Sequence, residues 1–147
     1  MHGHVGGNVK LHLNQGREKM KKLIGAALTA IAMTTPAAAN EPYGIWETKR
    51  DRKGAYLHVR VHPCDNNAEM LCGTVHQTFN TPHTEIVGRP IFWDLQPTSN
   101  TKWGGGTVWD AETDRNFDAK VIMGSTRLRV EGCVGFLCDG QNWSRVQ

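Results

Sequence analysis

The amino-acid sequence predicts an all-β protein, a small antiparallel barrel that follows a cleaved signal peptide. Three observations lead to this prediction. Short runs that alternate apolar and polar residues recur after residue 39, and no long run has the helical period of about 3.6 residues. All four cysteines lie in the same part of the chain. A basic, an apolar and a small-residue segment follow one another just before it.

The composition restricts the class of protein. Of the 147 residues, 39% are hydrophobic and 21% are charged, which is typical of a globular chain and excludes a collagen, a coiled coil and a multi-span membrane protein. The longest strongly apolar run, Leu23–Met33, has 11 residues. A helix of that length reaches only about 16 Å, whereas the hydrocarbon of a bilayer is about 30 Å thick. We therefore expect no membrane-spanning helix.

The N-terminal region has the three parts of a secretory signal. Lys21 and Lys22 form a basic start, Leu23–Met33 an apolar centre and Ala37–Ala39 a small-residue end. The cations stay on the cytoplasmic side, the apolar segment enters the translocon, and the small side chains fit the signal peptidase. The pattern predicts a signal peptide over residues 20–39 and export of the rest. A buried N-terminal helix is the alternative.

The domain organisation follows from this signal. Translation is expected to start at Met20, and residues 1–19, which show no periodicity, are interpreted as an upstream extension from a misplaced start codon. Residues 40–147 contain no linker, repeat or low-complexity segment, so we expect them to form one domain.

Removal of the leader changes the charge balance. Five of the 17 basic residues and one of the 14 acidic residues lie within residues 1–39, so the mature chain keeps 12 basic and 13 acidic groups. Its net charge is then −1, and a nucleic-acid-binding function loses its electrostatic support. We expect no nucleic-acid partner.

Seven alternating runs define the expected strands. The clearest is the second, in which every residue from Leu57 to Val61 alternates between an apolar and a polar side chain. Asp110–Arg115 is a polar turn, and Gly104–Gly106 marks a bulge or a bend inside a run. In chain order, the runs are Gly44–Lys49, Ala55–His62, Leu71–Phe79, Lys102–Asp110, Asn116–Met123, Thr126–Glu131 and Gln141–Val146.

Short strands without a helix favour a closed barrel or a sandwich. Closure removes the exposed sheet edges, which benefits an exported protein that meets few chaperones. The five tryptophans supply the bulk that the interior of such a small barrel needs. We expect an antiparallel meander of the lipocalin-like or calycin-like kind.

The cysteine count predicts disulfides. An even number of cysteines in an exported chain of 108 residues favours two bridges over four reduced thiols. We expect the local bridges Cys64–Cys72 and Cys133–Cys138, each across one hairpin. A crossed linkage stays open if the strands of the two hairpins are adjacent.

The local pairing also predicts a strand register. With the first two cysteines opposite each other, Val61 faces Val75, and apolar residues meet along one face with one mismatch. With the other two cysteines opposite each other, Leu128 faces Trp143 on the apolar side. Because a slip of one residue would move every side chain to the other face, this agreement supports the pairing.

Histidines offer a possible metal site. In the predicted register, His62 and His76 are diagonal neighbours about 7–8 Å apart, a spacing that a zinc or copper site tolerates. Arg60 is opposite His76 and would repel a cation. A solvated polar face is therefore the preferred interpretation, and the metal site is the weaker alternative. The mature chain contains His58, His62, His76 and His83.

Motifs for catalysis are not found. There is no Gly-x-Ser-x-Gly turn for a nucleophilic serine, and the cysteines are assigned to bridges. The carboxylate pairs Asp110/Glu112 and Asp114/Asp118 lie in or beside a turn, where carboxylates usually cap their own backbone. We predict no catalytic residue and no cofactor.

Tryptophans are the candidate ligand contacts, because an indole combines a large apolar body with one hydrogen-bonding tip. The alternative is that all of them belong to the core. Arg60 and Arg129 lie on the polar faces of their strands, so we expect them to point outward and to take no part. The candidate ligand-binding residues are Trp46, Trp103, Trp109 and Trp143.

Several short motifs occur in an order that resembles the bacterial family called domain of unknown function 2147. The resemblance spans residues 43–146 and implies a small periplasmic β-barrel of Gram-negative bacteria, with no activity attached. Phe117, where the family usually has Tyr, and Thr113–Arg115, in place of a Gly-Lys turn, depart from the pattern. The motifs are Gly44–Trp46, Cys64 with Leu71–Gly73, Gly88–Ile91, Trp103–Gly106 with Asp110, Leu128–Val134 and Gln141–Val146.

These observations lead to a functional prediction. We expect a non-enzymatic periplasmic binding or scaffolding barrel for an apolar or amphiphilic ligand or an envelope partner. The alternative is a metal-binding or enzymatic protein that uses the histidine and arginine face of its strands. A large apolar interior would favour the first, and convergent histidines the second.

The leader pattern generates a first testable prediction. The mature protein should begin at Asn40, because the small-residue segment ends at Ala39. N-terminal sequencing of the exported protein checks this. A mature chain that begins at Met1 or Met20 would contradict the prediction.

Overall fold

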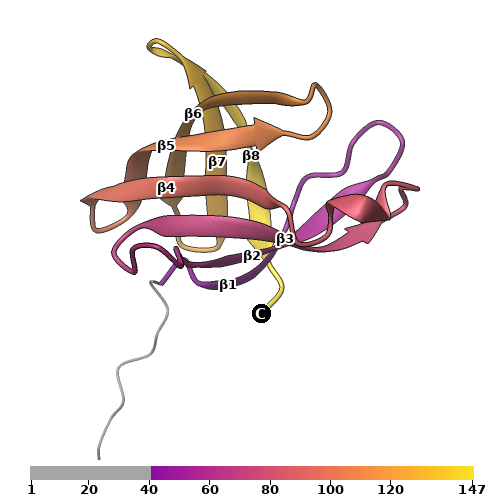
Figure 1. Ribbon diagram of the computed structural model, residues 1–147, viewed down its shortest axis with the longest axis horizontal. Helices are drawn as coiled ribbons and strands as arrows, with labels where there is room; N and C mark the ends of the chain where they lie inside the picture. The colour runs from indigo at the N-terminus through magenta and orange to yellow at the C-terminus, as the bar shows by residue number, and fades with distance from the viewer. Residues whose placement is uncertain (1–40) are drawn as a thin grey trace, which may run out of the picture. The chain divides into compact units, whose positions relative to one another are not determined.

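Residues 41–147 are described by the computed structural model, and they form a closed barrel of eight antiparallel strands (Figure 1). Each strand pairs with the next one along the chain, and β8 pairs with β1. The predicted all-β barrel is thus confirmed, while the predicted signal peptide lies outside the described residues. The strands are β1 (Gly44–Glu47), β2 (Tyr56–Pro63), β3 (Leu71–Phe79), β4 (Pro90–Ser99), β5 (Lys102–Asp110), β6 (Arg115–Met123), β7 (Arg127–Val134) and β8 (Leu137–Arg145).

Helical structure is minor in the described part of the chain. A short 3-10 helix, η1 (Thr84–Ile86), lies in the connection between β3 and β4. None of the helices described there has the length and the apolar character needed to cross a membrane.

The sequence analysis missed β4. Pro90 and Pro97 lie within this strand, and Asp94 has a positive φ of 58°, so the backbone departs from regular alternation. Ile91 and Phe92, which are adjacent, are both buried. A period of two residues cannot be recognised where the strand is bent in this way. The prediction of seven strands was therefore wrong by one.

The register between β2 and β3 differs from the predicted one. Val75 faces Val59 rather than Val61, which is a shift of two residues. From Val59 to Pro63 this shift of two preserves the face of each side chain, so the predicted apolar face is correct there, whereas from Tyr56 to His58 the register differs by one residue. Gly73 faces Val61 instead, and a Cβ at Gly73 would lie only 2.7 Å from Cε1 of Phe92, so the ring of Phe92 leaves no room for a side chain there.

The pairing of β2 with β3 is interrupted by a β-bulge. The register shifts between His58 and Val59, which leaves His76 as the additional residue of β3. After the bulge, Tyr56 faces Phe79 and the two rings stack with their centroids 4.6 Å apart. The bulge predicted at the glycine triplet also occurs, since the register of β5 shifts between Gly104 and Gly106.

Both predicted disulfides are present, and no described cysteine is free. Cys133 faces Cys138 and Leu128 faces Trp143, so the predicted register of β7 and β8 is confirmed. Cys64 lies beyond the end of β2 and is therefore not opposite Cys72, although the two are bridged.

Closure between β1 and β8 depends on few residues. Trp46 pairs with Arg145 and Glu47 with Ser144, and Ile45 exchanges backbone hydrogen bonds with residues 146–147 just beyond β8. The Arg145 guanidinium stacks on the Trp46 ring at 4.3 Å and donates a hydrogen bond of 2.8 Å to the Tyr43 carbonyl oxygen. The Arg145 side chain therefore adds to the backbone pairing that joins the first strand to the last.

The barrel interior is filled by side chains. Aromatic residues from β1, β4 and β8 meet there, and the Phe92 and Trp143 ring centroids are 6.0 Å apart. Small barrels are commonly filled in this way. The buried core consists of Trp46, Val59, Val61, Leu71, Val75, Ile91, Phe92, Leu95, Ala119, Val121, Met123, Leu128, Val130 and Trp143.

The disulfides generate a second prediction. Replacing Cys133 and Cys138 by serine should lower the free energy of unfolding by about 2–3 kcal/mol, because the bridge closes a short loop and restricts the unfolded chain. The matched pair Cys64→Ser with Cys72→Ser should have an effect of similar size. Urea denaturation followed by tryptophan fluorescence measures both. A double variant with an unchanged midpoint would contradict this account.

Candidate functional site

Two of the predicted ligand-binding residues, Trp46 and Trp143, lie in the core. The Nε1–H of Trp46 donates to the Pro42 carbonyl oxygen at 2.8 Å, and the Nε1–H of Trp143 donates to Oε1 of Gln141 at 3.0 Å. Both indoles are buried and have their polar atom satisfied. Neither offers a free ring or a free donor to a ligand.

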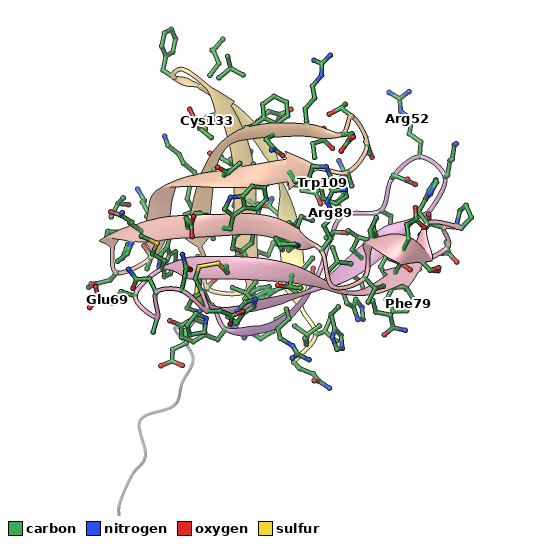
Figure 2. All side chains as sticks on the ribbon, viewed as in Figure 1. Arg52, Glu69, Phe79, Arg89, Trp109 and Cys133 are labelled. Atoms are coloured by element: carbon green, nitrogen blue, oxygen red, sulfur yellow. A yellow bond between two sulfur atoms is a disulfide. The ribbon has the colours of Figure 1, made fainter. Side chains whose placement is uncertain are left out.

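Trp109 is covered by a stacked arginine. The Arg89 guanidinium lies 3.5 Å from the centre of the Trp109 ring, and the two labelled side chains adjoin in Figure 2. Asp114 accepts a 2.8 Å hydrogen bond from the Trp109 Nε1–H and lies 3.6 Å from Arg89. Trp103 is half-buried and packs against the core. A ligand role for the four tryptophans stays a prediction, which would require these contacts to open.

The histidines of the predicted metal alternative do not converge. Nε2 of His62 is 2.8 Å from the Thr74 hydroxyl, and its Nδ1 is 2.7 Å from the Pro63 carbonyl oxygen. Nδ1 of His76 is instead 3.3 Å from the Arg60 guanidinium. These contacts favour a polar surface over a metal site.

The other two histidines contact glutamates. Nε2 of His58 is 3.3 Å from Glu47, and the His58 ring packs on Phe79 with the ring centres 4.5 Å apart. His83 is 3.0 Å from Glu85 on the exposed 3-10 segment. The pKa of the Glu85 carboxyl lies below its ordinary value, chiefly because it accepts a hydrogen bond from its own backbone N–H and secondly because of His83.

Clusters of possible metal ligands in the described part of the chain all involve bridged cysteines. One joins Cys64 and Cys72 to Asp94, and the other joins the second disulfide to Glu131. A bridged sulfur is not a thiolate, so these clusters lack the ligand that would bind zinc.

An open groove lies where β1 leaves the sheet. β1 ends at Glu47, whereas β8 begins at Leu137 and has no β1 partner before Ser144. Lys49 and Arg50 pass beside this uncovered edge, and the groove between them and β8 has a volume of about 490 Å³. Its lining residues are Glu47, Thr48, Lys49, Arg50, Arg127, Arg129, Gly140, Gln141, Asn142 and Ser144.

The charge of the groove is positive. Four cations line it, and Glu47 is the one carboxylate among its lining residues. Arg129 forms a 2.6 Å ion pair with Glu131, and Arg50 lies 3.9 Å from Glu47. Within residues 41–147, neither Lys49 nor Arg127 forms an ion pair. Two cations are therefore uncompensated at the groove.

Gln141 links the groove to the core. Its Oε1 accepts hydrogen bonds from the backbone N–H of Lys49 and from Nε1 of Trp143, both at 3.0 Å. Because the oxygen accepts both, the side-chain N–H groups of the same amide remain available as donors. The groove thus combines cations with neutral donors, which is the chemistry of an anion site.

Sequence reasoning did not identify this groove. It placed Arg129 outward, which is correct because the neighbouring Leu128 and Val130 are buried, but expected it to take no part in binding. The one signal was the pair Arg127 and Arg129 on the same face of a strand. The β1 end of the groove lies about 80 residues away in sequence, and only the closed barrel brings the two together.

Comparisons with known proteins agree with the fold. A family model described as "Uncharacterized protein conserved in bacteria (DUF2147)" matches residues 44–145. The structure is similar to that of protein HP1028 from the human pathogen Helicobacter pylori, which is described as belonging to the lipocalin family. The TM-score is 0.57 at 14% identity, over 73% of this chain and 84% of that chain. No curated protein matches the sequence.

The covered tryptophan generates a third prediction. Asp114→Ala should lower the free energy of unfolding by about 1–3 kcal/mol, because the buried Trp109 Nε1–H loses its acceptor. Asp114→Asn retains an acceptor and tolerates the positive φ of 52° at this position, so it should lose much less. Chemical denaturation measures the difference. Equal losses for the two variants would show that this hydrogen bond contributes little.

Proposed function

The chain belongs to the bacterial family whose description is "Uncharacterized protein conserved in bacteria (DUF2147)", and we propose that it is a non-enzymatic binding barrel of the periplasm that holds the anionic part of an amphiphilic ligand in its groove. The observation that carries this proposal is the concentration of positive charge there. Four cations line the groove beside one carboxylate, although residues 40–147 as a whole have a net charge of −1. Such an uneven distribution attracts an anion to one place on the surface.

The filled interior supports a binding site on the outside. Eight-stranded barrels either hold one small ligand or are filled by their own side chains, and here Trp46, Phe92 and Trp143 occupy the inside. The likeness to a protein described as a lipocalin concerns the fold alone at 14% identity. An apolar ligand enclosed by the barrel would have to displace core side chains, so the groove is the better candidate.

The disulfides support export. Two bridges in a small domain are typical of proteins that fold in an oxidising compartment, and the bacterial periplasm is such a compartment. This assignment agrees with the signal-peptide pattern of residues 20–39 and remains part of the proposal.

The groove residues support binding rather than catalysis. The lining described for the groove contains hydroxyls, at Thr48 and Ser144, but no histidine or cysteine. A hydroxyl needs an adjacent base to act as a nucleophile. Glu47, the lining carboxylate, contacts His58 and Arg50 instead.

A fourth prediction tests the groove with two detergents that share an alkyl chain. Dodecyl phosphate, used below its micelle concentration, should bind, whereas dodecyl maltoside should bind at least about tenfold more weakly because its head group is neutral. Lys49→Gln combined with Arg127→Gln should weaken dodecyl phosphate binding by about tenfold or more, since both cations lack a partner in the described structure. Calorimetric titration measures each affinity.

The control for this test is Arg115→Gln, which removes an exposed arginine at the start of β6, outside the groove lining. It should leave the affinity for dodecyl phosphate unchanged. The proposal is wrong if the two detergents bind equally well, or if the groove variant binds like the wild type.

A further inference from the structure

The turn between β7 and β8 exposes a run of apolar side chains. Val134, Phe136 and Leu137 are 68%, 94% and 70% exposed, and Gly135 lies between them. We call residues 134–137 the apolar tip. Figure 1 shows this turn projecting beyond the neighbouring strand β6. The other large apolar residues exposed in the described chain are Tyr43, Val87 and Val146, which lie outside this turn.

The apolar tip has no neighbours in the sheet. The last pair between β6 and β7 is Asp118 with Cys133, and β1 reaches β8 only near its C-terminal end. Within the hairpin, Val134 faces Leu137, so Gly135 and Phe136 form a two-residue turn. The exposed side chains at the apolar tip therefore add almost nothing to the packing of the barrel.

A disulfide holds this exposed turn in place. Cys133 and Cys138 are bridged directly beneath the apolar tip, with their Cα atoms 4.1 Å apart. A free two-stranded hairpin is marginally stable in water, and the bridge removes the need for packing partners. An apolar turn that is kept rigid and exposed in this way marks a surface for interaction.

The small size of the apolar tip indicates what kind of partner could contact it. A stable interface between two proteins buries about 800 Å² and 20–30 residues on each side, whereas the tip offers three apolar side chains. The strand positions just below it are polar, with Asp139 facing Gly132 and Gly140 facing Glu131. A second copy of the chain would therefore find too little apolar surface here.

A lipid bilayer needs no complementary surface. It also disfavours unsatisfied backbone groups, and a two-residue turn leaves few of them, since Val134 and Leu137 are already paired. We propose that Phe136 and Leu137 insert into the interfacial region of a lipid bilayer and dock the barrel on the membrane surface. This inference does not depend on the groove or on its ligand.

The charges near the apolar tip predict whether it should bind neutral or anionic lipids more strongly. Asp118 and Asp139 lie at the strand positions opposite Cys133 and Gly132, immediately below the tip. Their carboxylates give anionic lipids no advantage. Docking through the tip should therefore be as strong on neutral as on anionic vesicles and insensitive to salt, whereas binding through the cationic groove would require an anion and weaken with salt.

A fifth prediction tests the docking with vesicles of phosphatidylcholine. The protein should sediment with them, and Phe136→Ser combined with Leu137→Ser should weaken this binding by at least about tenfold, because both apolar anchors are lost. The matched control is Val87→Ser, which removes an exposed apolar residue at the end of η1 and should change nothing. Unchanged thermal unfolding confirms that each variant is folded.

A second variant tests the docking by a signal that appears on binding, so that the test does not depend only on a loss of binding. Phe136→Trp should still bind, and the fluorescence of the introduced indole should shift to the blue and be quenched by brominated lipid. Absence of wild-type binding to phosphatidylcholine, equal binding by the serine variant, or no fluorescence shift for Phe136→Trp would overturn the proposal. Binding only to envelope vesicles that retain their proteins would assign the apolar tip to a protein partner and would also overturn it.

Discussion

The packing of large aromatic side chains inside an eight-stranded barrel is the constraint on which the rest of the structure depends. Trp46, Phe92 and Trp143 occupy the interior together, and Gly73 provides the space for the Phe92 ring on the facing strand. In the pairing of β2 with β3, Gly73 rather than Val75 lies opposite Val61. Because the inside is filled, any binding function of the barrel belongs to its outer surface and its ends.

The strand lengths make that outer surface uneven. β1 is four residues long and covers only one end of the nine-residue β8, so the barrel closes at one end and leaves a cationic groove beside the uncovered edge. At its other end, the same hairpin of β7 and β8 extends past β6 as an apolar turn. One surface depends on charge and the other on apolar area, so salt and lipid composition separate their effects.

Local geometry explains which parts of the pairing were predictable. Only four residues separate Cys133 from Cys138, and both cysteines lie within the paired strands, so the assumption that they face each other led to the correct register of β7 and β8. The connection between β2 and β3 is longer, and Cys64 lies beyond the end of its strand, so the same argument there was wrong by two residues. β4 was missed because two prolines and the positive φ of Asp94 remove the alternation on which strand prediction relies.

The sequence by itself determined the all-β class and the buried faces of several strands, and it favoured the two local disulfides, because alternation and cysteine spacing act between residues that are close in the chain. Only the tertiary structure decided that Trp46 and Trp143 fill the interior rather than surround an opening. Likewise, only the tertiary structure showed that Lys49 and Arg127 line the same groove. Alternation shows which face of a strand a side chain occupies, but the space on that face is set by residues far away in the sequence, which meet only when the barrel closes.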